Sequence, residues 1–244
     1  MQLGLARYTS CWLDKNFVKQ QIDFLTCCFL FKTQSVKDIV LWEDIMEIEV
    51  KKLTPALLSD WLEYFDNTAF SDEDEWPGCY CMCYHWNERL DRRNDWGETL
   101  EQVYRKTGKA DNRARAIRLI QNGGMQGYLA YHAGKAVGWC NANDKRNYHT
   151  VLSSLFDDAE DTEKVKSVVC FCIAKEMRNK GIATRLLEKV CEDAAYEGYE
   201  YVEAYPYSHG QDHDFHGPLT MYEKRGFIRI GRQEDCIIMR KNLR

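Results

Sequence analysis

The sequence lacks two features that would direct a chain of this size to a membrane or to nucleic acid. Its longest apolar run, residues 24–31, is far shorter than the roughly 20 residues that span a bilayer. It also lacks an excess of positive charge, since its formal net charge is −5. Binding to nucleic acid or to anionic lipid needs a basic face. We therefore expect neither a membrane nor a nucleic acid as a partner.

A secretory signal is also missing, because no basic start is followed by a long apolar centre and a cleavage site. The chain has 11 cysteines, an odd number that does not fit a complete disulfide framework. Free thiols in a reducing compartment explain this composition best. The expected location is therefore cytoplasmic.

Two common phosphate-binding patterns are absent as well. No G-x-x-x-x-G-K-[ST] segment follows an apolar run, and no G-x-G-x-x-G segment opens a helical one. The sequence therefore predicts neither a P-loop nor a Rossmann nucleotide site.

What the sequence does contain is a basic turn at residues 178–183, RNKGIA, between an apolar run at 168–173 and an amphipathic segment at 181–196. This order predicts a strand, a tight turn and a helix. The first backbone amides of a helix are unpaired and carry partial positive charge, so such a turn can hold a phosphate or pyrophosphate. Gly181 and Ala183 are small enough to let that group approach. The alternative is an ordinary strand-to-helix turn that happens to be basic.

A second motif favours the phosphate-binding interpretation. Arg178, Gly181 and Ala183 fill the pattern Q/R-x-x-G-x-G/A, and residues 221–227, MYEKRGF, fill Y-x-x-x-G-F about forty residues later. In this order and spacing, the chain resembles the GNAT superfamily of acetyl-CoA-dependent N-acetyltransferases. The resemblance implies an α/β fold: a mixed central sheet of six to seven strands flanked by helices, with the fourth and fifth strands splayed apart.

The resemblance also implies a cofactor site. Acetyl-CoA is expected as co-substrate, with its pyrophosphate at the basic turn and its pantetheine arm along the end of the fourth strand. Backbone contacts are carried over to Cys172 and Ile173. The remaining expected cofactor contacts are Arg178, Asn179, Lys180, Gly181, Ile182, Ala183 and Thr184.

Acetyl transfer needs an acid for the departing thiolate and a base for the amine. A phenol, with a pKa of about 10, can protonate a thiolate, and the Y-x-x-x-G-F match makes Tyr222 the candidate acid. Many family members carry a glutamate on the fourth strand, and residues 168–172 contain none. Glu203, which alternation places on one strand face with Tyr201 and Tyr205, is the nearest substitute. A structural ion pair is the alternative role for Glu203.

Two functions follow as hypotheses. The first is transfer of acetyl from acetyl-CoA to a primary amine of a small molecule or peptide by direct attack in a ternary complex. The second is a catalytically silent acyl-CoA-binding or regulatory module. The expected partner is the amine acceptor, and a homodimer is left open.

The expected domain covers residues 46–244, because a regular pattern of elements begins only at residue 46. Residues 1–45 are expected to be an accessory extension or an upstream mis-start. Periodicity and turn residues predict helices at 55–65, 113–122, 181–196 and 219–224, and strands at 46–53, 127–132, 135–142, 168–173, 200–205, 227–230 and 236–240.

Two clusters resemble metal sites. Cys79, Cys81, Cys83 and His85 alternate, but same-face neighbours on a strand lie roughly 6.5 to 7 Å apart, too far to share one ion. The second cluster is a loop with His209, Asp212, His213, Asp214 and His216. We expect no metal, and interpret the first cluster as a wall of the acceptor pocket or as packing, and the second as a polar loop on the substrate side.

Overall fold

The computed structural model describes residues 46–72, 76, 78–85, 109–148, 164–208, 215–233 and 235–244. From Glu47 onward these residues belong to one compact unit, Glu47–Arg244. The expected extension at 1–45 lies outside the described residues. Among the helices of the described segments, none is both long and apolar enough to cross a membrane.

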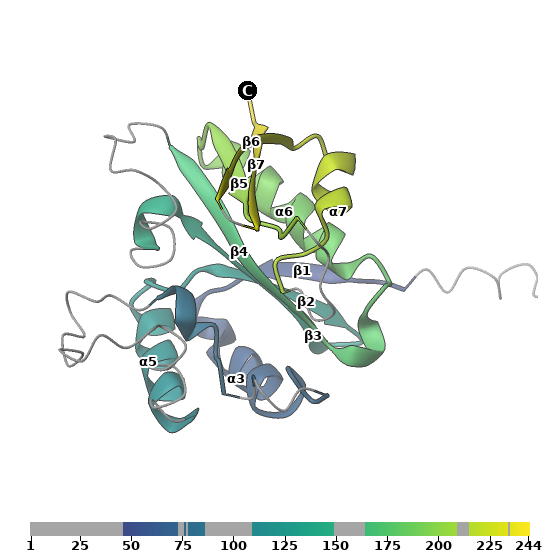
Figure 1. Cartoon of the computed structure of the whole chain (residues 1–244). Helices are drawn as coiled ribbons and strands as arrows, with labels where there is room; N and C mark the ends of the chain where they lie inside the picture. The colour runs from purple at the N-terminus through teal and green to yellow at the C-terminus, as the bar shows by residue number, and fades with distance from the viewer. Residues whose placement is uncertain are drawn as a thin grey trace, which may run out of the picture. The chain divides into compact units, whose positions relative to one another are not determined.

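The core of the unit is one seven-stranded sheet with the order β1-β2-β3-β4-β5-β7-β6 (Figure 1). Neighbouring strands are antiparallel except β4 and β5, which run parallel. The predicted mixed α/β sheet is therefore confirmed. The strands are β1 (Glu49–Lys52), β2 (Gly127–His132), β3 (Lys135–Asp144), β4 (Val165–Ile173), β5 (Tyr201–Ala204), β6 (Ile228–Gln233) and β7 (Cys236–Asn242).

Helices cover both faces of this sheet. In Figure 1, α3 (Leu58–Asn67) and α5 (Lys109–Gln121) lie on one side, and α6 (Ile182–Tyr196) and α7 (Leu219–Lys224) lie on the other. On the α3 side, Trp61 packs edge-on against Trp139 of β3, with ring centroids 5.9 Å apart. This aromatic contact is part of the buried core between α3 and the face of the sheet that lies opposite to α6.

Most predicted elements are found close to their expected positions, and α7 and β2 have the predicted bounds. The first predicted helix begins differently, because Pro55–Leu57 form a 3-10 turn and the α-helix starts at Leu58. The hairpin between β2 and β3 turns at Ala133 and Gly134, which both have positive φ, as a type I′ turn requires.

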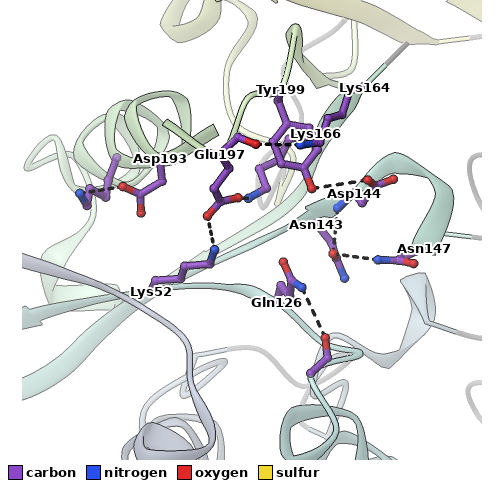
Figure 2. Close-up of polar contacts among 12 residues, drawn as sticks. Lys52, Gln126, Asn143, Asp144, Asn147, Lys164, Lys166, Asp193, Glu197 and Tyr199 are labelled. Atoms are coloured by element: carbon purple, nitrogen blue, oxygen red, sulfur yellow. Dashed lines mark hydrogen bonds and ion pairs between the residues drawn. The ribbon is translucent and has the colours of Figure 1, made fainter. Parts of the chain in front are cut away.

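Strand β4 is longer than predicted, because it begins at Val165 and includes Lys166 and Ser167. The Lys166 side chain is buried, and its ammonium lies 2.6 Å from a Glu197 carboxylate oxygen. Figure 2 shows Lys52 meeting the same carboxylate from the other side. Burial disfavours the charged ammonium and lowers the pKa of Lys166, although Glu197 opposes the shift. A charged residue is thus accommodated inside β4 by a distant partner.

The two central strands separate part-way along. Strand β4 pairs with β5 from Val165↔Tyr201 to Val168↔Ala204, and no further pair joins these strands among the described residues. At this point β4 carries one extra residue, Val169, because Asn141 and Ala142 of β3 face Cys170 and Val168. An inserted residue bends a strand and increases its twist. The predicted splay of the fourth and fifth strands is present, with a bulge where it begins.

Candidate active site

The basic turn forms a concave arrangement of backbone amides at the start of α6. Asn179 and Gly181 both adopt the left-handed conformation, with φ of 61° and 77°. Residues that alternate in this way point successive N–H groups toward one centre, which suits an anion. Gly181 precedes α6 and has no side chain to cap its first amides. We call residues 178–184 the cradle.

Arg178 does not point its charge freely toward the cradle. Its guanidinium forms a two-fold ion pair with Asp72, with N–O distances of 2.7 and 3.0 Å, and its Nε donates to the Ile173 carbonyl at 3.2 Å. These hydrogen bonds lower the pKa of Asp72. Arg178 therefore ties the cradle to the end of β4 and to the segment after α3. Its partner, 106 residues away in sequence, was not predicted.

A cavity of about 600 Å³ runs from the cradle to the open end of β4. The cradle residues Arg178, Asn179, Gly181, Ile182, Ala183 and Thr184 line it, as does Ile173. Of the predicted cofactor contacts, only Cys172 and Lys180 are not part of the lining. The prediction missed Phe171, Met177, Phe215, Gly217, Pro218 and Met221.

The alternation of β4 explains why Phe171 belongs to the cavity and Cys172 does not. Successive side chains on a strand point to opposite faces, so Phe171 and Ile173 share the α6 side. Cys172 faces the α3 side, where its carbonyl accepts a hydrogen bond from the Tyr64 hydroxyl at 2.7 Å. The period-2 pattern of residues 168–173 was a signal that could have identified Phe171.

Tyr222 lies directly beneath the cavity wall. Its side chain is fully buried, and its hydroxyl donates to the His216 carbonyl at 2.5 Å. A Cβ on Gly217, a lining residue, would lie 3.4 Å from the same hydroxyl. Gly217 therefore lies between the Tyr222 hydroxyl and the cavity, and the hydrogen bond to the backbone carbonyl of His216 fixes the position of that hydroxyl.

Glu203 lies on the opposite face of the sheet and is fully buried. Its carboxylate contacts Arg240 at 2.6 Å and Lys145 at 3.3 Å, and it accepts a hydrogen bond from Tyr205 at 3.0 Å. Tyr205 in turn bonds Ser167 of β4 at 2.7 Å. Neither Glu203 nor Tyr222 is among the residues that line the cavity. The structural ion pair, one of its two predicted roles, is formed.

This ion pair gives a stability prediction. Glu203→Gln should lower the free energy of unfolding by about 3 kcal/mol, because Arg240 and Lys145 would lose their shared carboxylate in a buried site. Urea denaturation measures the change. Glu223→Gln is the matched control: it removes an exposed partner of Arg229 and should cost less than about 1 kcal/mol. Equal losses in the two variants would contradict the prediction.

Comparison with known proteins identifies the family. Residues 90–227, more than half of the chain, match the model of the acetyltransferase (GNAT) family. The chain belongs to the GNAT acetyltransferase family. The position of the match agrees with the two motifs, which both lie within it. No curated protein matches the chain in sequence.

Several solved structures of acetyltransferases are similar to this one. The PaiA N-acetyltransferase of Thermoplasma acidophilum, in complex with coenzyme A, is 16% identical; the match covers 81% of this chain and 99% of that one, with a TM-score of 0.46. YncA of Salmonella typhimurium, a putative acetyltransferase with acetyl-CoA, is 13% identical; the match covers 81% of this chain and 94% of that one, with a TM-score of 0.44. A GNAT-family acetyltransferase of Listeria monocytogenes is 11% identical; the match covers 81% of this chain and 95% of that one, with a TM-score of 0.49.

The alternating cysteines of this GNAT domain do not lie on a strand. Cys81 adopts a left-handed conformation, and Met82–Tyr84 form a 3-10 turn. The Cys81 sulfur accepts a hydrogen bond from the Trp139 indole at 3.1 Å, which places it in the aromatic core. Burial lowers the pKa of His85, whose ring contacts Asn141, to about 4.

In the part of the chain that the structure describes, no three His, Cys, Asp or Glu side chains are grouped to hold a metal ion. Of the second cluster, only His216 is described, and the residues from His209 to Asp214 lie outside. Burial lowers the pKa of His216 to about 4, so its imidazole is neutral at physiological pH. Its Nε2 lies 3.3 Å from the Tyr84 hydroxyl.

Proposed function

We propose that this GNAT protein transfers the acetyl group of acetyl-CoA to a primary amine of a small molecule or peptide, by direct attack in a ternary complex. The continuity of the cavity carries the proposal: it joins an anion-binding cradle at one end to a separated pair of strands at the other. A pyrophosphate suits the cradle amides, and an amide-bearing arm suits the open edge of β4.

The edge of β4 offers one defined position for that arm. The Phe171 N–H points to the β5 side, since it donates to the Phe215 carbonyl there at 2.6 Å. Ile173, two residues further along, presents its N–H on the same side, while its carbonyl accepts the Arg178 Nε. We therefore assign the pantetheine contact to Ile173 and no longer to Cys172.

For the chemistry, Tyr222 is the proposed acid that protonates the departing thiolate. Glu203 is not placed to act as the base, because its carboxylate is buried away from the cavity in an ion pair with Arg240. That pairing favours a second candidate function, the catalytically silent acyl-CoA-binding or regulatory module, because such a module needs the cradle and no base. Both candidates require the cavity to bind acetyl-CoA.

Turnover separates the two candidates. The release of coenzyme A from acetyl-CoA should accelerate with at least one member of a panel of polyamines, aminoglycosides, amino acids and peptide N-termini. Binding of acetyl-CoA in calorimetry without turnover of any acceptor would favour the silent module. Absence of binding to the folded protein would contradict both.

The cradle gives a prediction for Arg178. Arg178→Ala should weaken acetyl-CoA binding by about 1 to 3 kcal/mol, through loss of a charge-assisted contact or of the link that holds the cradle. Calorimetric titration measures the change.

The variant Asp72→Asn distinguishes these two causes. It removes the carboxylate that competes for the guanidinium, so binding should hold or tighten if Arg178 contacts phosphate directly. Weaker binding in Asp72→Asn, similar to that of Arg178→Ala, would make Arg178 a positioning residue. Unchanged affinity in Arg178→Ala would remove Arg178 from the site.

A further inference from the structure

The cavity has ends of different chemistry, which fixes the direction of any acyl-CoA within it. The cradle end carries backbone amides and the side chains of Asn179 and Thr184, whereas the far end is formed by Phe171, Phe215 and Met221. If the phosphates lie in the cradle, as the proposed function requires, the acyl group lies among these three apolar side chains. The size of the far end therefore decides which acyl groups fit.

The backbone of Phe215 is fixed at this end by strong contacts. Its carbonyl accepts the Phe171 N–H at 2.6 Å, on the edge that β5 has left. Its ring packs edge-on against Phe70, with centroids 5.3 Å apart, and against Trp76 at 6.1 Å. The next carbonyl, that of His216, holds the Tyr222 hydroxyl. The Phe215 backbone therefore cannot move aside without losing a hydrogen bond to β4, and its ring cannot turn away without losing the contacts with Phe70 and Trp76.

The residue after His216 confirms how tightly this segment is packed. Gly217 has a φ of 79°, and a Cβ there would lie 2.9 Å from the Met221 side chain and 3.4 Å from that of Phe171. A β-carbon at 2.9 Å would require the terminal methyl of the flexible Met221 side chain to shift. Gly217 thus lies in contact distance of both Met221 and Phe171, two side chains that line the cavity.

Beyond Phe171 the sheet closes, because Val168 of β4 pairs with Ala204 of β5. A growing acyl chain cannot continue along β4 and would have to pass the Phe215 ring, behind which lie Phe70 and Trp76. We propose that Phe215 is a specificity-determining residue that limits the acyl donor of this protein to acetyl and similarly short groups.

Calorimetric titration with coenzyme A, acetyl-CoA and octanoyl-CoA tests this assignment. Wild type should bind octanoyl-CoA at least about tenfold more weakly than acetyl-CoA, because the longer chain meets the Phe215 ring. In Phe215→Ala that ratio should fall by about tenfold or more, since removal of the ring opens the end of the cavity. In Phe215→Leu the ratio should lie between those of wild type and Phe215→Ala, and this variant provides the test if the alanine variant does not fold.

Met177→Ala is the matched control, because Met177 lines the same cavity next to the cradle. It should change the affinity for all three ligands by one common factor and leave the ratio of acetyl-CoA to octanoyl-CoA at the wild-type value. A wild-type ratio in folded Phe215→Ala or Phe215→Leu would overturn the role of Phe215 alone. Failure of coenzyme A to bind folded wild type would overturn the proposed function and this role with it.

Discussion

Gly181→Val should weaken acetyl-CoA binding by about a hundredfold or more while costing only about 1 to 2 kcal/mol of folding stability. A Cβ at position 181 would meet no protein atom within 4 Å, so the protein itself leaves room for a side chain. The stability cost comes from the φ of 77°, a left-handed conformation that is unfavourable for residues with a β-carbon. The binding cost comes from placing a branched side chain where the cradle amides converge. Calorimetry and urea denaturation measure the two effects separately.

Gly134→Val is the matched control for this prediction. Gly134 has a φ of 75°, and a Cβ there would also meet nothing within 4 Å, but it lies in the hairpin between β2 and β3 and outside the cavity lining. It should lose similar stability and bind acetyl-CoA as wild type does. An equal loss of affinity in both variants would mean that the effect is indirect, and wild-type affinity in Gly181→Val would remove the cradle from the binding site.

Tyr222→Phe should lower kcat by about 10² to 10⁴-fold with acetyl-CoA affinity nearly unchanged, if the hydroxyl protonates the departing thiolate. The phenylalanine ring keeps the packing against Phe227, whose ring centroid is 5.4 Å away. The lost hydrogen bond to the His216 carbonyl should cost about 1 kcal/mol of stability. Steady-state kinetics, calorimetry and denaturation give the three values.

A second role for the Tyr222 hydroxyl would be to hold the segment Phe215–Gly217 in place. The variant Tyr84→Phe tests this structural role separately from acid catalysis. Tyr84 also contacts His216 through its hydroxyl, at the imidazole, and does not line the cavity. If holding His216 were all that matters, both variants should reduce kcat by the same modest factor. Equal and small reductions would therefore contradict the role of Tyr222 as an acid.

The sequence was sufficient for the fold and for the strand, turn and helix around residues 178–184, because these signals are local. Residues 178–184 follow one strand and begin one helix, so a short window contains the turn, its glycine and its charges. The same holds for α7, whose bounds were predicted correctly from Leu219 to Lys224. Where one window contains all the interacting groups, periodicity and turn chemistry decide the structure.

The interactions that were not predicted join distant segments. In the sequence, the charge of Lys166 suggests that it lies outside the apolar strand. In the structure, Lys166 is part of β4 because Glu197, just after α6, pairs with its ammonium. The Arg178 side chain reads as a free cation, yet Asp72 binds it from another part of the fold. Without the three-dimensional structure, neither partner can be chosen among the many acidic residues of the chain. The sequence analysis therefore named no partner for either side chain.

The short pairing of β4 and β5 has a consequence for how the protein resists unfolding. Four residue pairs join the half of the sheet that contains β1 to β4 to the half that contains β5, β7 and β6. A molecule in the cavity would touch β4 through Phe171 and Ile173, and the chain leading to β6 through Phe215 and Met221. It would act as a removable cross-link, adding about 2.7 kcal/mol at a concentration one hundred times its Kd. Resistance to proteases would then follow the supply of that molecule in the cell.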